Sequence, residues 1–364
     1  MTIPTLCTLF ATALSIAYAR TVSLSNVRLP MDNRGLPLIT GEASIIFSSG
    51  AFWFYFNNWG GCRGVDCCPS PHGCASCCFA EGWAPDPCVY TANHSVLVYS
   101  SSDFQEFIFE GVALSLESRL PGIEFRPQVV FNGSDYLMWY EDRWSSGGSN
   151  PGYALASSRS PAGPFSTISN SIVLGGKGRV GDYDIFVDIP SGRGYHVRTG
   201  LSIQPLDSTL SKPEGGAVDV PNLGVEGPAM FKRNGIYYLL VGEGCCACRG
   251  GSSVVVYTAP NPLGPWIHRG DVGSNSSGHV FDPHSPWNYA TRAQQTKVVE
   301  VPDGAGGTQY LWVGNQWVTS QSPGNPRNND LLFFTVLNFK EDGNLSQIAW
   351  ADTVTITLPD ITHN

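Results

Sequence analysis

Short apolar runs recur along the chain, and turn residues join them in pairs. One pair lies at 226–240, EGPAMFKRNGIYYLL, where Arg233-Asn234-Gly235 separates two apolar runs. Asn-Gly between two apolar runs is a strong signal of a β-hairpin with a tight turn. The pattern therefore predicts two antiparallel strands, with the carboxylate of Glu226 immediately before the first of them.

The same hairpin pattern occurs four more times, and a third apolar run follows most of the hairpins. The other hairpins lie at 44–56, 128–140, 185–198 and 296–313. The third runs lie at 95–99, 152–156, 254–257 and 331–334. Repeated units of roughly 40 to 50 residues are typical of a β-propeller whose blades have up to four strands. We therefore expect an all-β, five-bladed propeller that forms a single domain over 20–364.

The innermost strands of such a propeller line a central channel and run in the same direction. The residue before each innermost strand then projects at one mouth of the channel. All five units of the sequence have polar residues at these positions: Glu42, Glu124 with Arg126, Asp182, Glu226 and Gln294. Several carboxylates that converge at one mouth favour a functional site over an ordinary wet channel.

Residues 1–19 have the features of a secretory signal peptide. The segment 3–17 is mostly apolar, and Ala17-Tyr18-Ala19 has the small residues of a cleavage site. The alternative is a short N-terminal anchor, although the apolar run is too short and too interrupted to span a bilayer comfortably. We expect a secreted protein that is not bound to a membrane.

The eleven cysteines agree with secretion. Removal of Cys7 with the signal leaves ten, of which seven lie in an insertion at 59–90 in the first blade and three lie at 245–248. An even number in an oxidising compartment predicts disulfides, and two odd clusters require at least one bridge between them. The alternative is a zinc site, because Cys74 and Cys77 have C-x-x-C spacing. Both clusters follow second strands, so we expect a disulfide-rich rim beside the channel mouth.

Charge and surface signals limit the possible partners. The net charge is −9, only 14% of the residues are charged, and no run is rich in Lys or Arg. A basic patch is the usual footprint of nucleic-acid binding, so nucleic acid is not an expected partner. We expect a monomer without a cofactor or metal ion. Four N-x-S sequences are compatible with a secreted glycoprotein: those at Asn93, Asn132, Asn275 and Asn344.

Several segments resemble glycoside hydrolase family 43, a family of five-bladed propellers. The hairpin at 226–240 resembles the general-acid motif of that family, and Asp182-Tyr-Asp-Ile-Phe-Val-Asp188 resembles its second-carboxylate motif. Residues 41–46 resemble the first-blade motif, with Glu42-Ala43 where the family usually has Asp-Pro.

Other segments are similar to the exo-β-1,3-galactanase branch of the family. They lie at 126–139, 294–296 and 314–317. That branch lacks the usual base Asp and uses a Glu before Arg-Pro together with a Gln in the fifth blade. In this sequence Phe125 separates Glu124 from Arg126, and neighbours on a strand point to opposite faces. The double-Cys loops suggest a divergent, eukaryotic-type secreted member.

The resemblance implies an inverting glycoside hydrolase that acts on a cell-wall polysaccharide such as a β-galactan, an arabinan or a xylan. One carboxyl group then protonates the leaving oxygen while a second activates water. Glu226 is the expected acid, and Asp182 is the neighbour expected to raise its pKa, with Asp184 as the alternative. Glu42 is the expected base. The alternative is that Gln294 and Glu124 hold the water.

The remaining candidates are expected to bind substrate. Trp144 and Trp317 could stack on sugar rings, and the alternative for each is packing within a blade. Arg126 could bind a sugar hydroxyl or pair with a channel carboxylate. Glu124 and Gln294 complete this set. Two functions from other classes stay open, a carbohydrate-binding propeller that has lost catalysis and a protein-interaction propeller.

Overall fold

A computed structural model describes most of the chain. The described residues are 19–59, 94–121, 124–142, 152–189, 191–221, 226–243, 250–274, 290–317, 319–320 and 328–359. All eleven cysteines and Trp144 lie outside these ranges. Of the cleavage site Ala17-Tyr18-Ala19, only Ala19 lies inside them. The predictions that depend on these residues stay predictions. Apart from a 3-10 turn at Leu116–Ser118, the described residues form strands and loops.

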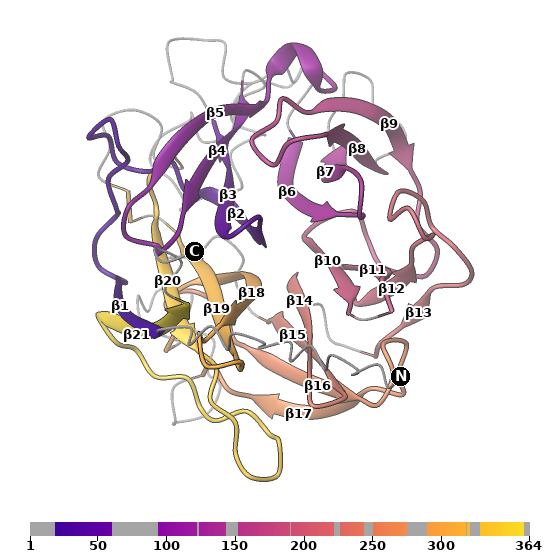
Figure 1. Ribbon diagram of the computed structural model, residues 1–364. Helices are drawn as coiled ribbons and strands as arrows, with labels where there is room; N and C mark the ends of the chain where they lie inside the picture. Colours follow the sequence, from indigo (N-terminus) through magenta and orange to yellow (C-terminus); the bar gives the residue numbers. More distant parts are fainter. Residues whose placement is uncertain are drawn as a thin grey trace, which may run out of the picture.

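Five antiparallel sheets surround a central channel (Figure 1). Blade one contains β2 (Gly41–Ser48), β3 (Ala51–Asn58), β4 (Ser95–Ser101) and β5 (Ile108–Leu114). Blade two contains β6 (Glu124–Phe131), β7 (Tyr136–Asp142), β8 (Gly152–Ser158) and β9 (Ser166–Ile172). Blade three contains β10 (Tyr183–Asp188), β11 (Arg193–Arg198), β12 (Ser202–Pro205) and β13 (Val218–Asp219). Blade four contains β14 (Glu226–Arg233), β15 (Ile236–Gly242), β16 (Val255–Ala259) and β17 (Ile267–Asp271). Blade five contains β18 (Gln294–Pro302), β19 (Thr308–Gln316) and β20 (Leu331–Val336). The predicted five-bladed propeller is confirmed, and all five predicted hairpins form the first two strands of a blade.

The two ends of the described chain close the ring beside blade five. β1 (Ala19–Ser25) pairs antiparallel with β21 (Thr353–Pro359) along its whole length. Asn26, the residue after β1, donates its side-chain amide to the Phe334 carbonyl at 3.0 Å and accepts the Phe334 N–H at 2.7 Å. Through these two bonds the pair is attached to β20 (Figure 1).

Apolar side chains fill the spaces between neighbouring blades. Between blades one and five, Phe54 and Phe56 of β3 belong to the same buried cluster as Leu311 and Val313 of β19. Successive side chains of a strand point to opposite faces, so the nearly continuous buried runs of strands such as β4 and β15 allow both faces of a blade to pack in this way. Burial of one Phe or Leu side chain contributes about 2 kcal/mol relative to exposure, so these inter-blade layers hold the ring together.

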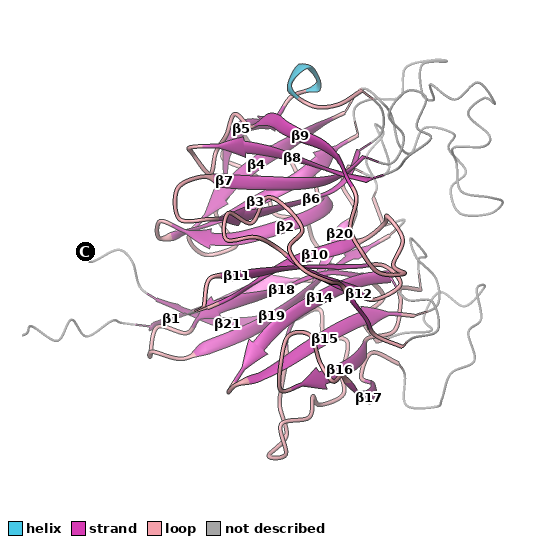
Figure 2. Ribbon diagram, turned by 90° about the vertical axis from the view of Figure 1, so that its right-hand side faces the viewer, coloured by secondary structure: helices cyan, strands magenta, loops and turns pink. Residues whose placement is uncertain are grey.

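The channel is divided along its length. At the mouth where the innermost strands end, a cavity of about 550 Å³ is lined by Phe131, Met230 and other mainly apolar residues. Lys297 and Asp184 also line this cavity, with the Lys297 Nζ 2.8 Å from the Asp184 Oδ1. The opposite mouth, where the innermost strands begin, carries the polar residues predicted from the sequence. Figure 2 shows the blades edge-on between the two mouths.

Candidate active site

β-Bulges mark the start of the innermost strands at the polar mouth. The pairing register shifts between Gly41 and Ser44 in β2, between Phe125 and Gln128 in β6, and between Glu226 and Ala229 in β14. A bulge leaves one residue unpaired and re-aims its side chain.

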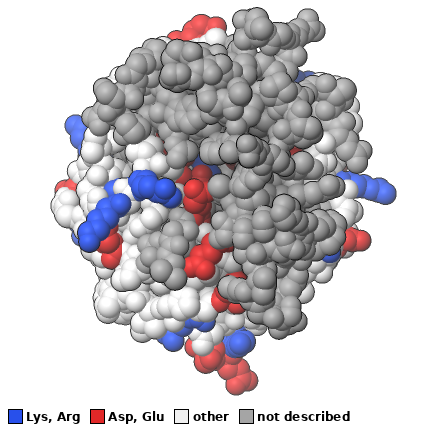
Figure 3. All heavy atoms as spheres, turned by 180° about the vertical axis from the view of Figure 1, so that it is seen from behind, with Lys and Arg blue, Asp and Glu red and all other residues white. Residues whose placement is uncertain are grey.

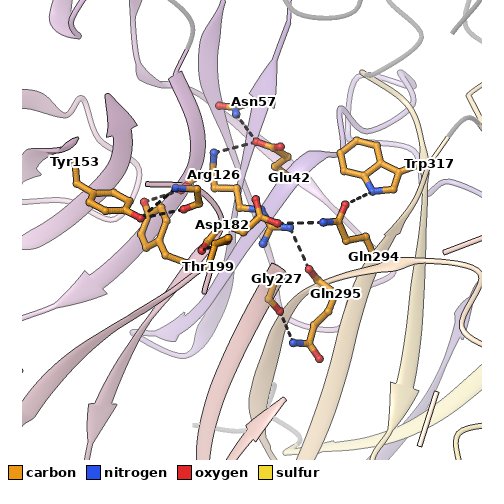
Figure 4. Close-up of polar contacts among 12 residues, drawn as sticks. Glu42, Asn57, Arg126, Tyr153, Asp182, Thr199, Gly227, Gln294, Gln295 and Trp317 are labelled. Atoms are coloured by element: carbon orange, nitrogen blue, oxygen red, sulfur yellow. Dashed lines mark hydrogen bonds and ion pairs between the residues drawn. The ribbon is translucent and has the colours of Figure 1, made fainter. Parts of the chain in front are cut away.

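The bulges in β2 and β6 hold Glu42 and Arg126 in the left-handed backbone region, with φ of 52° and 47°. This conformation costs a non-glycine residue roughly 1 to 2 kcal/mol, and such strain is concentrated at functional sites. The bulge in β14 has Gly227 at the corresponding position, with φ of 58°. As a result Glu42 and Arg126 meet near the channel axis (Figure 4).

Arg126 connects four blades at the centre of the site. Its Nε lies 2.8 Å from the Asp182 Oδ1, and its Nη2 donates to the Gln295 carbonyl at 3.1 Å. Its backbone N–H donates to the Glu42 Oε2 at 2.9 Å, and its carbonyl accepts the Tyr183 hydroxyl at 2.7 Å. Of the two roles expected for Arg126, the structure shows the pairing with a channel carboxylate.

The charge of Arg126 is surrounded by carboxylates. Burial lowers the pKa of the guanidinium, but four carboxylates outweigh burial and raise it: those of Asp182, Glu42, Glu141 and Glu226. The four come from blades one, two, three and four. Seen from this mouth, Asp and Glu side chains lie near the centre of the face (Figure 3).

Glu42 is held as a nearly buried carboxyl group, with 6% of its surface exposed. Burial is the main cause that raises its pKa from 4.5 to about 7; the nearby Arg126 lowers it and Asp182 raises it further. Its Oε2 accepts both the Arg126 N–H and the Asn57 Nδ2, the latter at 3.2 Å. Within the described part of the chain, Oε1 is therefore the oxygen that can exchange a proton with water.

Asp182 lies just before β10 and is held from two sides. Arg126 contacts its Oδ1, and the Gln294 Nε2 donates to its Oδ2 at 3.1 Å. The indole Nε1 of Trp317 in turn donates to the Gln294 Oε1 at 2.7 Å (Figure 4). Trp317 is only 2% exposed, so its contact with a sugar ring stays a prediction while its contact with Gln294 is observed.

Glu226, the expected acid, is the first residue of β14 and is half-buried. It pairs with Gly242 of β15 and lies close enough to Arg126 to raise the pKa of the guanidinium. The alternative to Asp182 lies elsewhere, because Asp184 is deeper in the channel and binds Lys297 and the Met230 N–H. The structure therefore brings Glu42, Asp182 and Glu226 around Arg126, and it separates Asp184 from them.

Two expected substrate contacts are not placed by the structure. Glu124 is the first residue of β6 and its backbone pairs with Asp142, but its side chain lies outside the described part. Trp144 lies outside the described residues altogether. The roles of both residues stay predictions.

Sequence reasoning missed Glu141, which is buried near the site in β7. Its backbone pairs with Phe125 and Tyr153. Burial is the largest cause of the raised pKa of the Tyr153 and Tyr183 hydroxyls, and the charge of Glu141 adds to it. A signal was available, because an acidic residue directly after the apolar run 136–140 lies at the end where a second strand returns to the polar mouth.

Sequence reasoning also missed the role of Gln295, which follows Gln294 in β18. Its side-chain amide donates to the Gly227 and Leu240 carbonyls, and its Oε1 accepts the Trp312 indole N–H at 2.6 Å. These bonds fix blade five against blade four beside the general-acid candidate. In the described part of the chain, no group of three or more His, Cys, Asp or Glu side chains could hold a metal ion, and no helix is long and apolar enough to cross a membrane.

Solved structures with the same fold include enzymes that act on β-1,3-linked galactose. A family 43 β-1,3-galactosidase solved with galactodeoxynojirimycin has a TM-score of 0.69 and 19% identity, over 90% of this chain and 99% of that chain. An exo-β-1,3-galactanase from Clostridium thermocellum has a TM-score of 0.67 and 19% identity, over 92% of this chain and 66% of that one. An exo-β-1,3-galactanase from Phanerochaete chrysosporium, solved with β-1,3-galactotriose, has a TM-score of 0.61 and 18% identity, over 91% and 67% of the two chains.

At these identities the likeness concerns the fold, and the chain spans about two thirds of the two galactanases. A search among curated proteins gives no match. The family model for glycosyl hydrolases family 43 matches residues 87–345, which is well over half of the chain. Together with the propeller, this match shows that the chain belongs to glycosyl hydrolases family 43 and is a glycoside hydrolase.

Proposed function

We propose that the enzyme hydrolyses a β-1,3-linked galactan, or a related cell-wall polysaccharide such as an arabinan or a xylan, with inversion at the anomeric carbon. The observation that carries this proposal is the convergence of Glu226, Asp182 and Glu42 around the Arg126 guanidinium at one channel mouth. The three solved structures of β-1,3-galactosidases and galactanases support galactan as the first substrate to test.

In the proposed mechanism, Glu226 gives its proton to the glycosidic oxygen as the bond from that oxygen to C1 breaks. A water molecule attacks C1 from the opposite face, and the Oε1 of Glu42 takes the proton that the water loses. The Oε2 of Glu42 accepts hydrogen bonds from the Arg126 N–H and the Asn57 amide, and these two bonds restrain rotation of the carboxylate.

Asp182 has a different role because donors occupy both of its oxygens. Its carboxyl group lies against Arg126, the same guanidinium that Glu226 approaches. A like charge in a poorly solvated site keeps a neighbouring carboxyl group protonated to higher pH, as a general acid requires. Asp182 is therefore proposed to tune Glu226 and not to activate water.

The mechanism implies a bell-shaped dependence of activity on pH. Glu42 must be ionised to accept a proton, and its pKa is raised to about 7. Activity is therefore expected to rise with pH through about 7 and to fall where Glu226 loses its proton.

The test is hydrolysis of β-1,3-galactan and a panel of aryl glycosides by the wild type and Glu226→Gln, with the product anomer followed by NMR. The expected result is inverted product from the wild type and a loss of roughly 10²- to 10⁴-fold in kcat for the variant. Glu214→Gln is the matched control, because Glu214 is exposed between β12 and β13 and its ion-pair partner among the described residues is the exposed Arg193. No release by the wild type, with equal glycan binding by both proteins, would favour a carbohydrate-binding propeller instead.

Secretion belongs to the proposal as well, since the predicted signal peptide at 1–19 is its only support. A mature N-terminus at Arg20, found by sequencing the exported protein, is the expected result.

A further inference from the structure

We propose that the cationic loop, Gly175-Gly-Lys-Gly-Arg179, forms a subsite at the polar mouth that binds an acidic group of the substrate, either a carboxylate or a sulfate ester. The inference rests on the proposed function for the sugar backbone of the substrate. It adds that the preferred polysaccharide is anionic.

The cationic loop lies next to the Asp182 position of the candidate active site. It follows β9, the outermost strand of blade two, and precedes β10, which begins blade three at the polar mouth. The Arg179 N–H donates to the Thr199 carbonyl at 3.0 Å, and the Thr199 N–H donates to the Asp182 carbonyl at 2.8 Å. Backbone bonds therefore attach the loop to a residue of the site.

Glycines allow the loop to lie against blade three. A Cβ at Gly176 would lie 2.7 Å from the Asp219 Oδ1, and a Cβ at Gly178 would lie 2.8 Å from the Arg198 Nε. The Lys177 N–H donates to the same Asp219 oxygen at 2.8 Å. The two cationic side chains of the loop are exposed. The backbone is thus fixed, while both cations remain accessible to a ligand.

Arg198 adds a third positive charge behind the loop. It is only 2% exposed, and its Nη2 donates to the Gly175 carbonyl at 2.6 Å. Its Nη1 has no hydrogen-bond partner among the described residues. Burial lowers its pKa more than Tyr153 and Asp219 raise it. A nearly buried charge without an ion pair is costly, and a bound anion would offset that cost.

The local balance of charge differs from that of the whole protein, whose net charge is −9. The loop and its support contain three cations: Lys177, Arg179 and Arg198. The described carboxylate that binds the loop is that of Asp219, and it also accepts the Ser202 hydroxyl. Figure 3 shows Lys and Arg side chains beside the Asp and Glu side chains near the centre of this face. An excess of positive charge at the edge of a sugar site favours an anionic ligand.

The same charges indicate where the acidic group lies on the substrate. Neutral galactan offers only hydroxyl groups, which need no cation. The carboxylates of Glu42, Asp182 and Glu226 disfavour a further negative charge on the sugar that lies between them. The acidic group is therefore expected on a neighbouring sugar or a side branch that reaches blade three, as in a polysaccharide with uronic acid or sulfated residues.

The test compares neutral and anionic forms of the same backbone. Glu226→Gln, which is expected to bind without cleavage, is titrated by calorimetry with β-1,3-galactan, with the same galactan partly oxidised at C6 to uronic acid, and with the same galactan partly sulfated. Xylan and glucuronoxylan form a second pair. The anionic forms are expected to bind roughly five- to tenfold more tightly at low salt, the value of two exposed cations. The preference should shrink as salt rises, because the Debye length falls from about 30 Å at 0.01 M to about 8 Å at 0.15 M.

Lys177→Gln combined with Arg179→Gln, in the same Glu226→Gln background, removes both exposed charges and leaves the backbone bonds of the loop in place. The preference for anionic forms is expected to fall to about twofold or less, with the affinity for neutral galactan unchanged within about twofold. Lys212→Gln combined with Lys340→Gln is the matched control. It removes the same charge from exposed turns at the opposite mouth, so the preference should persist.

The outcomes separate this inference from the proposed function. Equal affinity for neutral and anionic forms, or a preference that survives in the double loop variant, overturns the inference, while binding of neutral galactan still supports the proposed substrate. A preference for the carboxylated or the sulfated galactan identifies the acidic group. If neither backbone binds in any form, the inference and the proposed function are both wrong.

Discussion

Single residues at the polar mouth are strained and nearly buried, and both conditions oppose folding. Glu42 combines a left-handed backbone with a carboxyl group that is almost completely removed from water. Neither feature stabilises the protein locally, so the surrounding blades must hold the residue in place. Such features are expected where a residue has a chemical task.

The buried carboxyl group of Glu42 makes stability depend on pH. Its pKa is about 7 in the folded protein and about 4.5 in the unfolded chain, so the folded state binds more protons between these values. Stability from this group is therefore complete below pH 4.5 and is lost as pH rises through about 7. A change from 4.5 to about 7 corresponds to about 3 kcal/mol.

Glu42→Gln removes this titration and keeps an acceptor for Arg126 and Asn57. The free energy of unfolding of the variant, relative to the wild type, is expected to increase by about 3 kcal/mol between pH 4.5 and pH 7 and to stay level above it. Urea denaturation at several pH values measures the difference. A difference that stays constant from pH 4.5 to 8 contradicts the raised pKa.

At the scale of single residues, the sequence predicted which residues lie at the polar mouth, but it did not predict which of them contact one another. The repeat placed Glu42, Asp182, Glu226 and Gln294 at one mouth because each precedes an innermost strand. It could not show that Arg126 pairs with Asp182 and donates its backbone N–H to Glu42, because these contacts join blades that are far apart in sequence. Side-chain partners of this kind depend on the packing of blades and leave no local pattern.

At the scale of elements, bulges decide which residues of the innermost strands reach the site. The sequence predicted strands at these places but no bulges. A bulge adds one residue to one strand and leaves the apolar run that follows it unchanged, so the sequence pattern hardly reveals it. The register shifts between Phe125 and Gln128. Simple alternation along the strand therefore could not predict which face of blade two the residues before the shift belong to.

Gly227 shows how tightly the bulge in β14 fits its neighbour. Its φ is 58°, and a Cβ at this position would lie 2.7 Å from the Gln295 carbonyl oxygen. Gly227→Ala is therefore expected to destabilise the protein by about 3 kcal/mol, partly from backbone strain and partly from displacement of β18. Thermal or urea unfolding measures the loss.

Gly235 provides the control for this prediction. It also has a positive φ, of 79°, but a Cβ there would have no atom within 4 Å. Gly235→Ala is expected to cost about 1 kcal/mol from backbone strain alone. Equal losses for the two variants would mean that contact with β18 contributes nothing at Gly227.

At the scale of the whole molecule, side chains satisfy the free backbone edges of the innermost strands. Glu42 accepts the N–H of Arg126 in the next blade, Ser44 accepts that of Val129, and Asp184 accepts that of Met230. An unpaired strand edge is otherwise a liability. These bonds explain why polar residues recur along the channel even away from the catalytic mouth.

The sequence pattern also did not predict how the two ends of the described chain pair beside blade five. β1 and β21 pair although they lie at opposite ends of the chain, and neither is part of a repeated hairpin. The sequence predicted the number of blades from local hairpins, each of which carries its own turn signal. Pairing between distant ends has no turn and depends only on where the completed ring brings them.

The ion pair between Lys297 and Asp184 is expected to be the main polar link inside the channel. The Lys297 Nζ donates to the Asp184 Oδ1 at 2.8 Å and to the Gln128 Oε1 at 3.1 Å, and Asp184 also accepts the Met230 N–H. The group therefore joins blades two, three, four and five. The two charged side chains are only 12% and 2% exposed, so little solvent is available to replace a lost partner.

Lys297→Met leaves the Asp184 carboxylate buried without its cation. Loss of one partner of a buried pair costs about 3 to 5 kcal/mol, mainly because the remaining charge is uncompensated. Lys297→Met combined with Asp184→Asn removes that charge and keeps an acceptor for Met230, so the double variant is expected to be more stable than Lys297→Met alone. Arg193→Met, which breaks an exposed pair with Glu214, is expected to cost less than about 1 kcal/mol. If the two single Lys and Arg variants lose equal stability in urea denaturation, or if the double variant is the least stable of the set, the channel pair is not what links the blades.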